Sequence, residues 1–271
     1  MESRFSHPMV MSMPDIHPTA IVSDQAVIAD DVSIGPFAII DAGVNIGAGC
    51  IIGGQAWITG STVMGEDNHI GYGAIIGGEP QDVSFDGLTN SNVVLGKGNR
   101  IREYVTIHRS TSEGGQTSVG DNNFLMAGVH LAHDVQMGDY NNVANNVLLA
   151  GHIIIVNRVF LGGGAGFHQF LHIGDYAIVQ GNAAVTRDVP PFCMAYGGNK
   201  LAGLNVIGLR RGGFSAEERV DIKRAYQLLF RSGGNFQEAL ITADQTEWSE
   251  AAQKLLAAAR EPSRKGLMSG K

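Results

Sequence analysis

The sequence predicts a mainly β protein: a left-handed parallel β-helix of hexapeptide repeats with a small C-terminal α-helical domain. Three observations support this fold class. Aliphatic residues recur every six positions, glycine accounts for 37 of the 271 residues, and helical periodicity starts only after residue 213. Glycine is therefore about twice as frequent as its usual ~7% share. Many tight turns explain the excess, because glycine adopts backbone conformations that other residues resist.

The hexapeptide repeat runs through most of the chain in two registers. In the first, every sixth residue from Ile16 to Ile76 is aliphatic or methionine. The second starts one residue out of phase at Leu95 and continues to Val185, with one skipped hexad at Glu113. A period of six matches neither the helical repeat nor simple strand alternation. It fits a chain that turns a corner every six residues, so that three flats form an 18-residue coil and stacked coils pair as parallel strands.

The breaks in this repeat predict the domain organisation. Residues 1–14 are expected to form a flexible leader, residues 15–192 the β-helix, and residues 193–271 a connector followed by the helical domain. Segments rich in Asp, Asn, Ser and Gly interrupt the repeat at 78–93 and 110–118. Such composition is typical of loops, so two excursions from the β-helix are expected there.

The helical domain is predicted from caps and periodicity. Ser215 and Glu218 have the spacing of a capping box before an apolar-periodic run that ends at Phe230. A Gly-Gly pair follows this run, and two further helices are expected over 235–242 and 246–260.

Composition and charge exclude several classes of partner. The formal net charge is −7, so nucleic acid and anionic membranes are disfavoured as main partners. The N-terminus lacks the pattern of a signal peptide, and no run of 18 apolar residues could span a membrane, so no integral membrane association is expected. Cys50 and Cys193 lie far apart without metal-type spacing. They fit two buried thiols in a reducing cytosol, and a cytoplasmic location is expected.

The 18-residue coil places a group of polar residues side by side. Residues 18 apart should lie directly above one another, about 4.8 Å apart. By this rule Gly151 lies above His133, and His152 lies above Asp134. The predicted cluster comprises His130, His133, Asp134, Gly151, His152, His168 and Gln169.

This cluster favours an active-site wall, because four of the nine histidines fall within it. Stacking alone leaves two alternatives open. The histidines could simply form hydrogen bonds between coils, or they could bind zinc, for which histidine is a common ligand. The His-Leu-Ala-His spacing of residues 130–133 is not a strong metal motif, so no metal is expected.

Seven segments of the chain resemble the UDP-N-acetylglucosamine O-acyltransferases of lipid A biosynthesis. The resemblance extends over nearly the whole chain from about Asp15, including the helical end. The segments that carry it are 101–109 (IREYVTIHR), 130–134 (HLAHD), 144–146 (ANN), 149–152 (LAGH), 167–170 (FHQF), 188–191 (DVPP) and 203–211 (GLNVIGLRR). Hexapeptide repeats alone would indicate only some transferase or a γ-type carbonic anhydrase.

The resemblance implies a reaction and a role for each catalytic residue. A (3R)-3-hydroxyacyl chain would pass from acyl carrier protein to the 3-hydroxyl of UDP-N-acetylglucosamine, the first step of lipid A synthesis. His133 would be the general base, since a histidine pKa lies near neutral pH. Asp134 would hold the imidazole, and this contact requires a corner because strand neighbours point to opposite faces. The backbone N–H of Gly151 would stabilise the oxyanion.

The same resemblance assigns the substrate contacts. His130, His152, His168 and Gln169 would line the substrate cleft. Asp82, in the first excursion, would contact the sugar, and the loop would reach over the site of a neighbouring subunit. The remaining positions would be Asn205 and Arg211 in substrate binding, Arg211 on the nucleotide side, and Gly181 at the end of the acyl groove, where it would act as a ruler for chain length.

Three departures from the family pattern concern the acceptor. Ser84 occupies a position where the family often has lysine, and Ile207 occupies one where it often has an acidic residue. Where the family can have three consecutive basic residues, this chain has only two arginines followed by Gly212. These changes put nucleotide affinity and the acceptor in question, including whether its 3-position carries a hydroxyl or an amino group. They do not affect the acyl chemistry.

The expected partners are acyl carrier protein, UDP-N-acetylglucosamine and two further copies of the chain in a homotrimer. No cofactor is expected, because the acyl donor is carried on the phosphopantetheine of acyl carrier protein. Four alternatives remain: a UDP-3-O-acylglucosamine N-acyltransferase, an acetyltransferase that uses coenzyme A, a γ-type carbonic anhydrase and a non-catalytic solenoid. Bound zinc would identify the carbonic anhydrase, and a solenoid would tolerate loss of His133.

Overall fold

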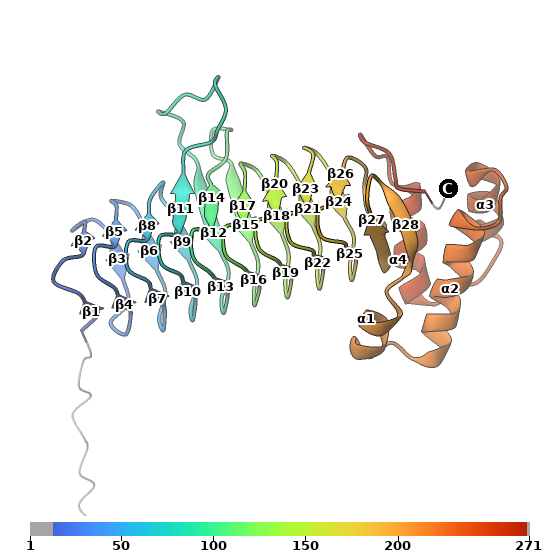
Figure 1. Ribbon diagram of the computed structural model, residues 1–271, viewed down its shortest axis with the longest axis horizontal. Coiled ribbons are helices and arrows are strands. Elements are labelled where there is room, and N and C mark those ends of the chain that lie inside the picture. Colours follow the sequence, from blue (N-terminus) through green and yellow to red (C-terminus); the bar gives the residue numbers. More distant parts are fainter. Residues whose placement is uncertain (1–12, 270–271) are drawn as a thin grey trace, which may run out of the picture.

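The structure is a computed structural model and describes residues 13–269. A long triangular prism of parallel strands carries a group of helices at its C-terminal end, and one loop projects from its side (Figure 1). Nearly all of the predicted leader, 1–14, lies outside the described residues.

Three sheets form the flats of the prism, and all their strand pairs are parallel except β27 with β28. The first contains, in spatial order, β1 (Asp15–Ile16), β4 (Ser33–Ile34), β7 (Ile51–Ile52), β10 (His69–Ile70), β13 (Arg100–Ile101), β16 (Phe124–Leu125), β19 (Asn142–Val143), β22 (Phe160–Leu161), β25 (Ile178–Val179), β27 (Cys193–Tyr196) and β28 (Lys200–Leu204). The second contains β2 (Ile21–Val22), β5 (Ile39–Ile40), β8 (Trp57–Ile58), β11 (Ile75–Gly78), β14 (Thr106–His108), β17 (His130–Leu131), β20 (Leu148–Leu149), β23 (Gly166–Phe167) and β26 (Ala184–Val185). The third contains β3 (Val27–Ile28), β6 (Asn45–Ile46), β9 (Val63–Met64), β12 (Asn92–Leu95), β15 (Gln116–Val119), β18 (Gln136–Met137), β21 (Ile154–Ile155) and β24 (His172–Ile173).

The hexapeptide repeat is what fills the core. In most two-residue strands the second residue is buried and the first faces outward, as in Ile40 at 1% exposure beside Ile39 at 36%. One large apolar side chain per flat therefore stacks on its equivalents in the coils above and below. The predicted parallel β-helix is confirmed.

The pairing register records the two excursions. Ile16 pairs with Ile34, 18 positions on, whereas Ile70 pairs with Ile101 and Leu95 pairs with Val119. The first excursion thus inserts 13 residues into a coil and the second inserts six. Both loops are shorter than the predicted 78–93 and 110–118, because β12 starts at Asn92 and β15 starts at Gln116. The paired segments extend into the expected loops, with Asn92 opposite Gln116.

Left-handed backbone conformations occur at many corners of the prism, and not only at glycine and asparagine residues. Positive φ values near +57° occur at bulky residues such as Phe37 and Tyr104. Each such conformation costs roughly 1 kcal/mol or more. At many corners a hydrogen bond between coils offsets this cost, as where the Tyr104 N–H donates to the Tyr72 carbonyl at 3.0 Å.

The C-terminal part begins with a hairpin that the sequence analysis missed, because β27 and β28 are antiparallel and lie outside the hexad pattern. Four helices follow: α1 (Val206–Arg211), α2 (Ala216–Phe230), α3 (Phe236–Asp244) and α4 (Glu250–Arg260). The predicted capping box of Ser215 and Glu218 is confirmed. The short helix α1 was not predicted, and α4 starts later than expected because Ser249 is its N-cap. Over the described chain, no helix is long and apolar enough to cross a membrane.

Candidate active site

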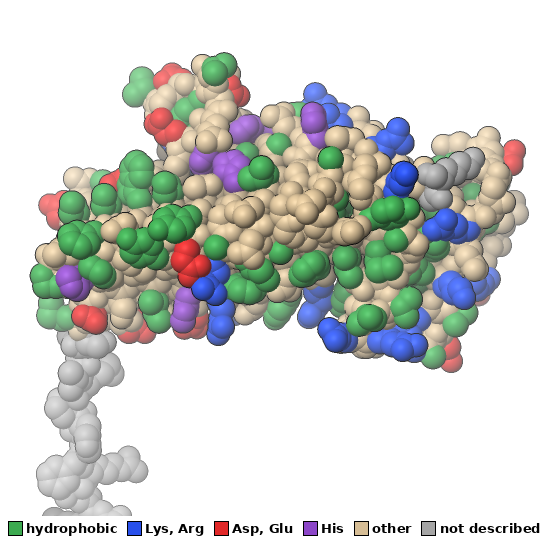
Figure 2. Space-filling view, viewed as in Figure 1, with side chains coloured by type: hydrophobic (Ala, Val, Ile, Leu, Met, Phe, Trp, Pro, Cys, Tyr) green, Lys and Arg blue, Asp and Glu red, His purple; other side chains and the backbone are tan. Residues whose placement is uncertain are grey.

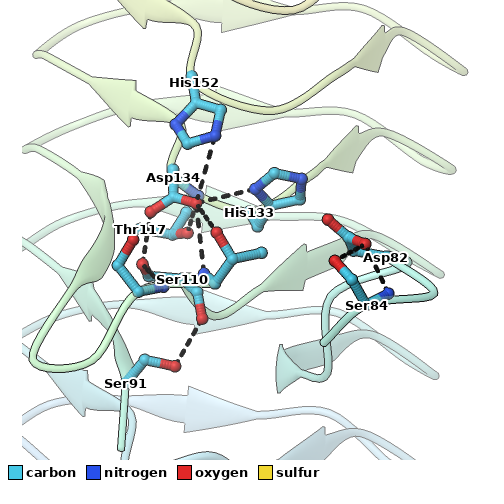
Figure 3. A network of polar contacts seen from close by, with 10 residues as sticks. Asp82, Ser84, Ser91, Ser110, Thr117, His133, Asp134 and His152 are labelled. Atoms are coloured by element: carbon cyan, nitrogen blue, oxygen red, sulfur yellow. Dashed lines mark hydrogen bonds and ion pairs between the residues drawn. The ribbon is translucent and has the colours of Figure 1, made fainter. Parts of the chain in front are cut away.

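A corner of the prism brings His133 and Asp134 into contact. Both follow β17, and Asp134 has a φ of +62°. This left-handed turn lets two successive side chains meet at the corner, and His133 Nδ1 lies 2.8 Å from Asp134 Oδ2 (Figure 3). The expectation that this contact needs a corner is confirmed. Because an ionised carboxylate only accepts hydrogen bonds, Nδ1 carries the proton and Nε2 keeps its lone pair.

The Asp134 carboxylate is held by the second excursion. The Ser110 hydroxyl donates to Oδ1, and Thr111 donates to Oδ2 from its hydroxyl at 2.8 Å and its N–H at 3.3 Å. Burial alone would raise the pKa of this carboxyl, but hydrogen bonds from Ser110, His133 and Thr111 lower it below its ordinary value. Asp134 therefore stays ionised and keeps its position relative to His133.

Gly151 is adjacent to the imidazole on the next coil. A Cβ atom there would lie 2.4 Å from His133 Cε1, so only glycine admits the ring at this position. Within residues 13–269 the Gly151 N–H donates to no acceptor of the protein. A free N–H beside a basic imidazole nitrogen is the arrangement that an oxyanion-stabilising donor requires.

A cleft of about 760 Å³ lies along this corner and the face of the second sheet. His130, His133, Gly151, His168 and Gln169 line it together, as the stacking rule predicts. Apolar residues from strands β20 and β26 also line it: Leu148, Leu149, Ala184 and Val185. The cleft thus combines a polar end, where a proton transfer can occur, with an apolar surface along the prism.

His108 packs against a residue of this site, His130, and the sequence analysis did not select it. Its ring meets that of His130 edge-on at 4.8 Å, and His130 Nδ1 lies 2.7 Å from the Thr106 hydroxyl. Burial, and then the neighbouring His130, lowers the pKa of His108 to about 4. The 18-residue stacking rule would place Met126 above His108. The second excursion adds six residues to this coil, so the residue above His108 is in fact 24 positions later. A count of 24 would have placed His108 next to His133.

His152 and Asp134 lie behind the cleft rather than in its wall. His152 Nε2 is 3.8 Å from Asp134 Oδ2, and its ring stacks on Phe170 with centroids 4.6 Å apart. It lines a separate cavity between the prism and the C-terminal segment. His152 therefore does not line the cleft that His133 and Gly151 share, and its role in substrate binding stays a prediction. As the second corner residue, with a φ of +60°, it points away from the face that Gly151 presents.

One set of described residues could offer three atoms to a metal. These atoms, from His133, Asp134 and His152, lie within 4.8 Å of one another. The Asp134 oxygens already accept from Ser110, Thr111 and His133. These three residues therefore belong to a hydrogen-bonded network centred on the Asp134 carboxylate.

Comparisons with known proteins identify the family. Residues 188–268 match the domain described as UDP-N-acetylglucosamine O-acyltransferase, domain 2, and residues 25–60 and 116–151 match bacterial transferase hexapeptide repeats. The acyl-[acyl-carrier-protein]–UDP-N-acetylglucosamine O-acyltransferase of Janthinobacterium sp. is 42% identical over 244 residues, which cover 89% of this chain and 93% of that protein. The enzyme of that name from Paraburkholderia phymatum is 43% identical over 232 residues, 84% of this chain and 88% of the relative. The match to the Synechocystis sp. enzyme, at 46% identity, spans 66% of that protein and 68% of this chain.

This chain belongs to the UDP-N-acetylglucosamine O-acyltransferase family. Solved structures agree with the sequence comparisons. The UDP-N-acetylglucosamine acyltransferase of Francisella novicida has a TM-score of 0.89 at 37% identity, with 94% of both chains covered. The enzyme from Moraxella catarrhalis has a TM-score of 0.88 at 41% identity, covering 93% of this chain and 99% of that one. The family resemblance of the seven segments is confirmed.

The acceptor residues expected from this O-acyltransferase family are only partly assembled within one chain. Asp82 lies in the first excursion and accepts from the Ser84 N–H at 2.8 Å and hydroxyl at 2.7 Å, which lowers its pKa (Figure 3). Gln81, next to it, lines the cleft of the same chain. The loop therefore approaches its own site here, and its reach over a neighbouring subunit stays a prediction.

The other family positions lie outside the cleft of this chain. Asn205 is a buried N-cap whose amide accepts from the Gly208 N–H and donates to the Tyr176 carbonyl, so its side chain has a structural role in this chain. Arg211, at the end of α1, is exposed and does not line the cleft. Gly181 occupies the corner between β25 and β26, where a Cβ atom would lie 3.0 Å from the Gly163 carbonyl oxygen. The substrate roles of Asn205 and Arg211, and the ruler role of Gly181, stay predictions.

Proposed function

We propose that this chain transfers a (3R)-3-hydroxyacyl group from acyl carrier protein to the 3-hydroxyl of UDP-N-acetylglucosamine, the first step of lipid A synthesis. The observation that carries the proposal is the constellation of His133, Asp134 and Gly151 at the polar end of an apolar cleft. The relatives above are named for this reaction. Their names favour it over the N-acyltransferase and coenzyme A alternatives.

The reaction follows from the geometry. His133 Nε2 removes the proton of the sugar hydroxyl as that oxygen attacks the thioester carbonyl carbon. The tetrahedral oxyanion accepts a hydrogen bond from the Gly151 N–H, which adds no reorganisation cost because the donor is already in place. Collapse expels the phosphopantetheine thiolate, and the imidazolium returns the proton to it. Ionised Asp134 stabilises the imidazolium between the two transfers. No cofactor of the protein takes part in these steps.

The donor surface is proposed from the distribution of charge. Residues 187–271 carry 13 Lys and Arg against nine Asp and Glu, whereas residues 1–186 carry six against 17. Figure 2 shows the basic side chains gathered over the helical end of the molecule. A carrier protein with an acidic surface would be attracted to this end and held away from the acidic prism.

A homotrimer is proposed from the apolar flanks of the prism. Large apolar side chains stand exposed on adjacent, paired strands of the second sheet: Ile21 at 66%, Ile39 at 36% and Trp57 at 41%. Contiguous exposed apolar surface on a folded protein marks an interface. A neighbouring prism would bury these residues and could complete the acceptor site with its own loop or helical end. A cytoplasmic location is also proposed, in keeping with two buried cysteines that form no disulfide.

The proposed reaction is tested with a panel of donors and acceptors. The enzyme is incubated with 3-hydroxyacyl chains on acyl carrier protein or on coenzyme A, and with sugar nucleotides that carry a 3-hydroxyl or a 3-amino group. Mass spectrometry is expected to show an acylated product from the carrier-protein donor and UDP-N-acetylglucosamine. Efficient use of coenzyme A donors alone would contradict the proposal, as would acylation of only the 3-amino acceptor.

A further inference from the structure

We propose that Arg264, in the C-terminal segment, is a positioning residue of the acyl-transfer site that acts through Phe170 and His152 on the Asp134 carboxylate. This inference rests on the proposed function and extends it, since neither the sequence pattern nor the family resemblance marks the C-terminal segment as part of the site. It concerns a group more than 100 residues away in sequence from the base.

A continuous stack joins the C-terminal segment to the base. The Arg264 guanidinium carbon lies 3.8 Å from the centre of the Phe170 ring. Phe170 stacks on His152 with centroids 4.6 Å apart and ring planes only 3° from parallel. His152 in turn meets the His133 ring edge-on at 5.1 Å, and its Nε2 is 3.8 Å from Asp134 Oδ2. Each layer therefore restrains the orientation of the next.

Corner geometry explains why these rings coincide. Asp134, His152 and Phe170 are spaced 18 apart, and their φ values are +62°, +60° and +65°. The N–H of His152 donates to the His133 carbonyl, and the N–H of Phe170 donates to the Gly151 carbonyl, both at 3.1 Å. Successive left-handed corners thus repeat the same side-chain direction, which makes a ladder of one carboxylate and two rings.

The C-terminal segment is fixed to the prism on the far side of the stack. The Asp188 N–H donates to the Gly266 carbonyl at 3.0 Å, and the Met268 N–H donates to the Asp188 carbonyl at 2.9 Å. Met268 is buried at 1% exposure. Arg264 therefore extends over Phe170 from an anchored backbone, although its own side chain is exposed.

The positive charge of Arg264 affects whether Asp134 interacts with His133 or with His152. Burial lowers the pKa of His152, Asp134 opposes this, and His133 and Arg264 lower it further. A protonated His152 would attract Oδ2 of Asp134 and compete with the Nδ1–H of His133 for the same oxygen. A neutral His152 leaves that oxygen to the base. Besides His152 and Arg264, the titratable groups that line this cavity are His172, Asp188 and Glu261.

A purely structural role for Arg264 would be to anchor the segment, and it predicts a different result. Loss of an anchor lowers thermal stability and leaves the pH dependence of turnover unchanged. Loss of a positioning charge raises the pKa of His152, so the acidic limb of the kcat/KM profile moves to higher pH. The pH profile and the titration of His152 therefore separate the two roles.

The experiment uses the full-length protein with Arg264→Gln, Arg264→Lys and the control Lys265→Gln. Lys265 Nζ lies 6.0 Å from the centre of the Phe170 ring, so its loss should have little effect. We expect Arg264→Gln to lower kcat roughly threefold at pH 7, the size of one exposed cation–π contact, with both KM values within about twofold of wild type. Arg264→Lys should restore part of the loss because it keeps the charge.

The same proteins are titrated by NMR with carbon-13-labelled histidine and without substrates. We expect the His152 pKa to rise in Arg264→Gln and to stay at the wild-type value in Lys265→Gln. An unchanged His152 titration would overturn the proposal, and so would a changed titration with an unmoved acidic limb. Absence of acyl transfer by the wild-type protein would instead contradict the proposed function, because the titration needs no turnover.

Discussion

Replacing Thr111 by valine removes one anchor of the catalytic carboxylate while preserving side-chain shape. The Thr111 hydroxyl donates to Asp134 Oδ2 at 2.8 Å, and the same oxygen receives the Nδ1–H of His133. A hydrogen bond to a charged group contributes roughly 1.5–3 kcal/mol. If about 1.4 kcal/mol of this is lost in the transition state, kcat falls about tenfold. Substrate KM should change little, because Thr111 does not line the cleft.

The pH profile of the Thr111→Val enzyme follows from the sign of the Asp134 shift. Hydrogen bonds from Ser110, His133 and Thr111 outweigh burial and hold the pKa of Asp134 below its ordinary value, so the carboxyl stays ionised into the acidic range. Removing one donor raises that pKa, and the acidic limb of kcat/KM should move to higher pH. Thr111→Ser retains the hydroxyl and serves as the matched control. A folded Thr111→Val enzyme with wild-type kcat and an unmoved acidic limb would refute this reasoning.

Three further predictions concern neighbouring positions. Gly151→Ala should reduce kcat at least tenfold, because the added Cβ would lie only 2.4 Å from His133 Cε1. Steady-state kinetics would measure the loss, and circular dichroism would check that the variant is folded. Full activity of the folded variant would contradict this prediction. The pKa of the His108 side chain is about 4 in the folded protein, against 6.5 for an unperturbed histidine. Between these two pH values the unfolded chain binds more protons at His108 than the folded protein does. The free energy of unfolding should therefore decline as the pH falls from about 6.5 to 4. Denaturant unfolding should show a flatter pH dependence for His108→Gln, and an unchanged slope would argue against it. Gly181→Met should favour acyl donors shorter by several carbons, since each buried methylene contributes roughly 0.8 kcal/mol and overpacking costs roughly 1–3 kcal/mol. The kcat/KM ratio for long and short donors decides this, and an unmoved ratio in a folded variant would exclude the ruler role.

The regular part of the fold could be predicted because one rule governs it. The 18-residue step correctly placed Gly151 next to His133 and His152 next to Asp134 on the following coil, since that coil has the regular length. The rule could not reveal which side of the corner each residue faces. That depends on backbone φ at the second corner residue, and His152 therefore points into a cavity other than the cleft.

The remaining misses have separate physical causes. His108 was not predicted as part of the histidine cluster, because six inserted residues change the step between coils from 18 to 24. The pairing of Ile107 with Leu131 shows this longer step. Ser110 and Thr111 lay in a segment with the composition of a loop, and their bonds to Asp134 depend on tertiary contact. The β27–β28 hairpin and α1 are too short to show a period, so local pattern carries little information about them.

His133 is proposed as the base for acyl transfer from acyl carrier protein to UDP-N-acetylglucosamine. The most direct test compares product formation by wild type and His133→Ala, with mass spectrometry for the product and size-exclusion chromatography for the assembly. We expect wild type to form the 3-O-acylated sugar nucleotide, and His133→Ala to be at least ~100-fold slower while its oligomeric state and thermal transition persist. Near-normal turnover by a correctly assembled His133→Ala enzyme would show that His133 is not the base.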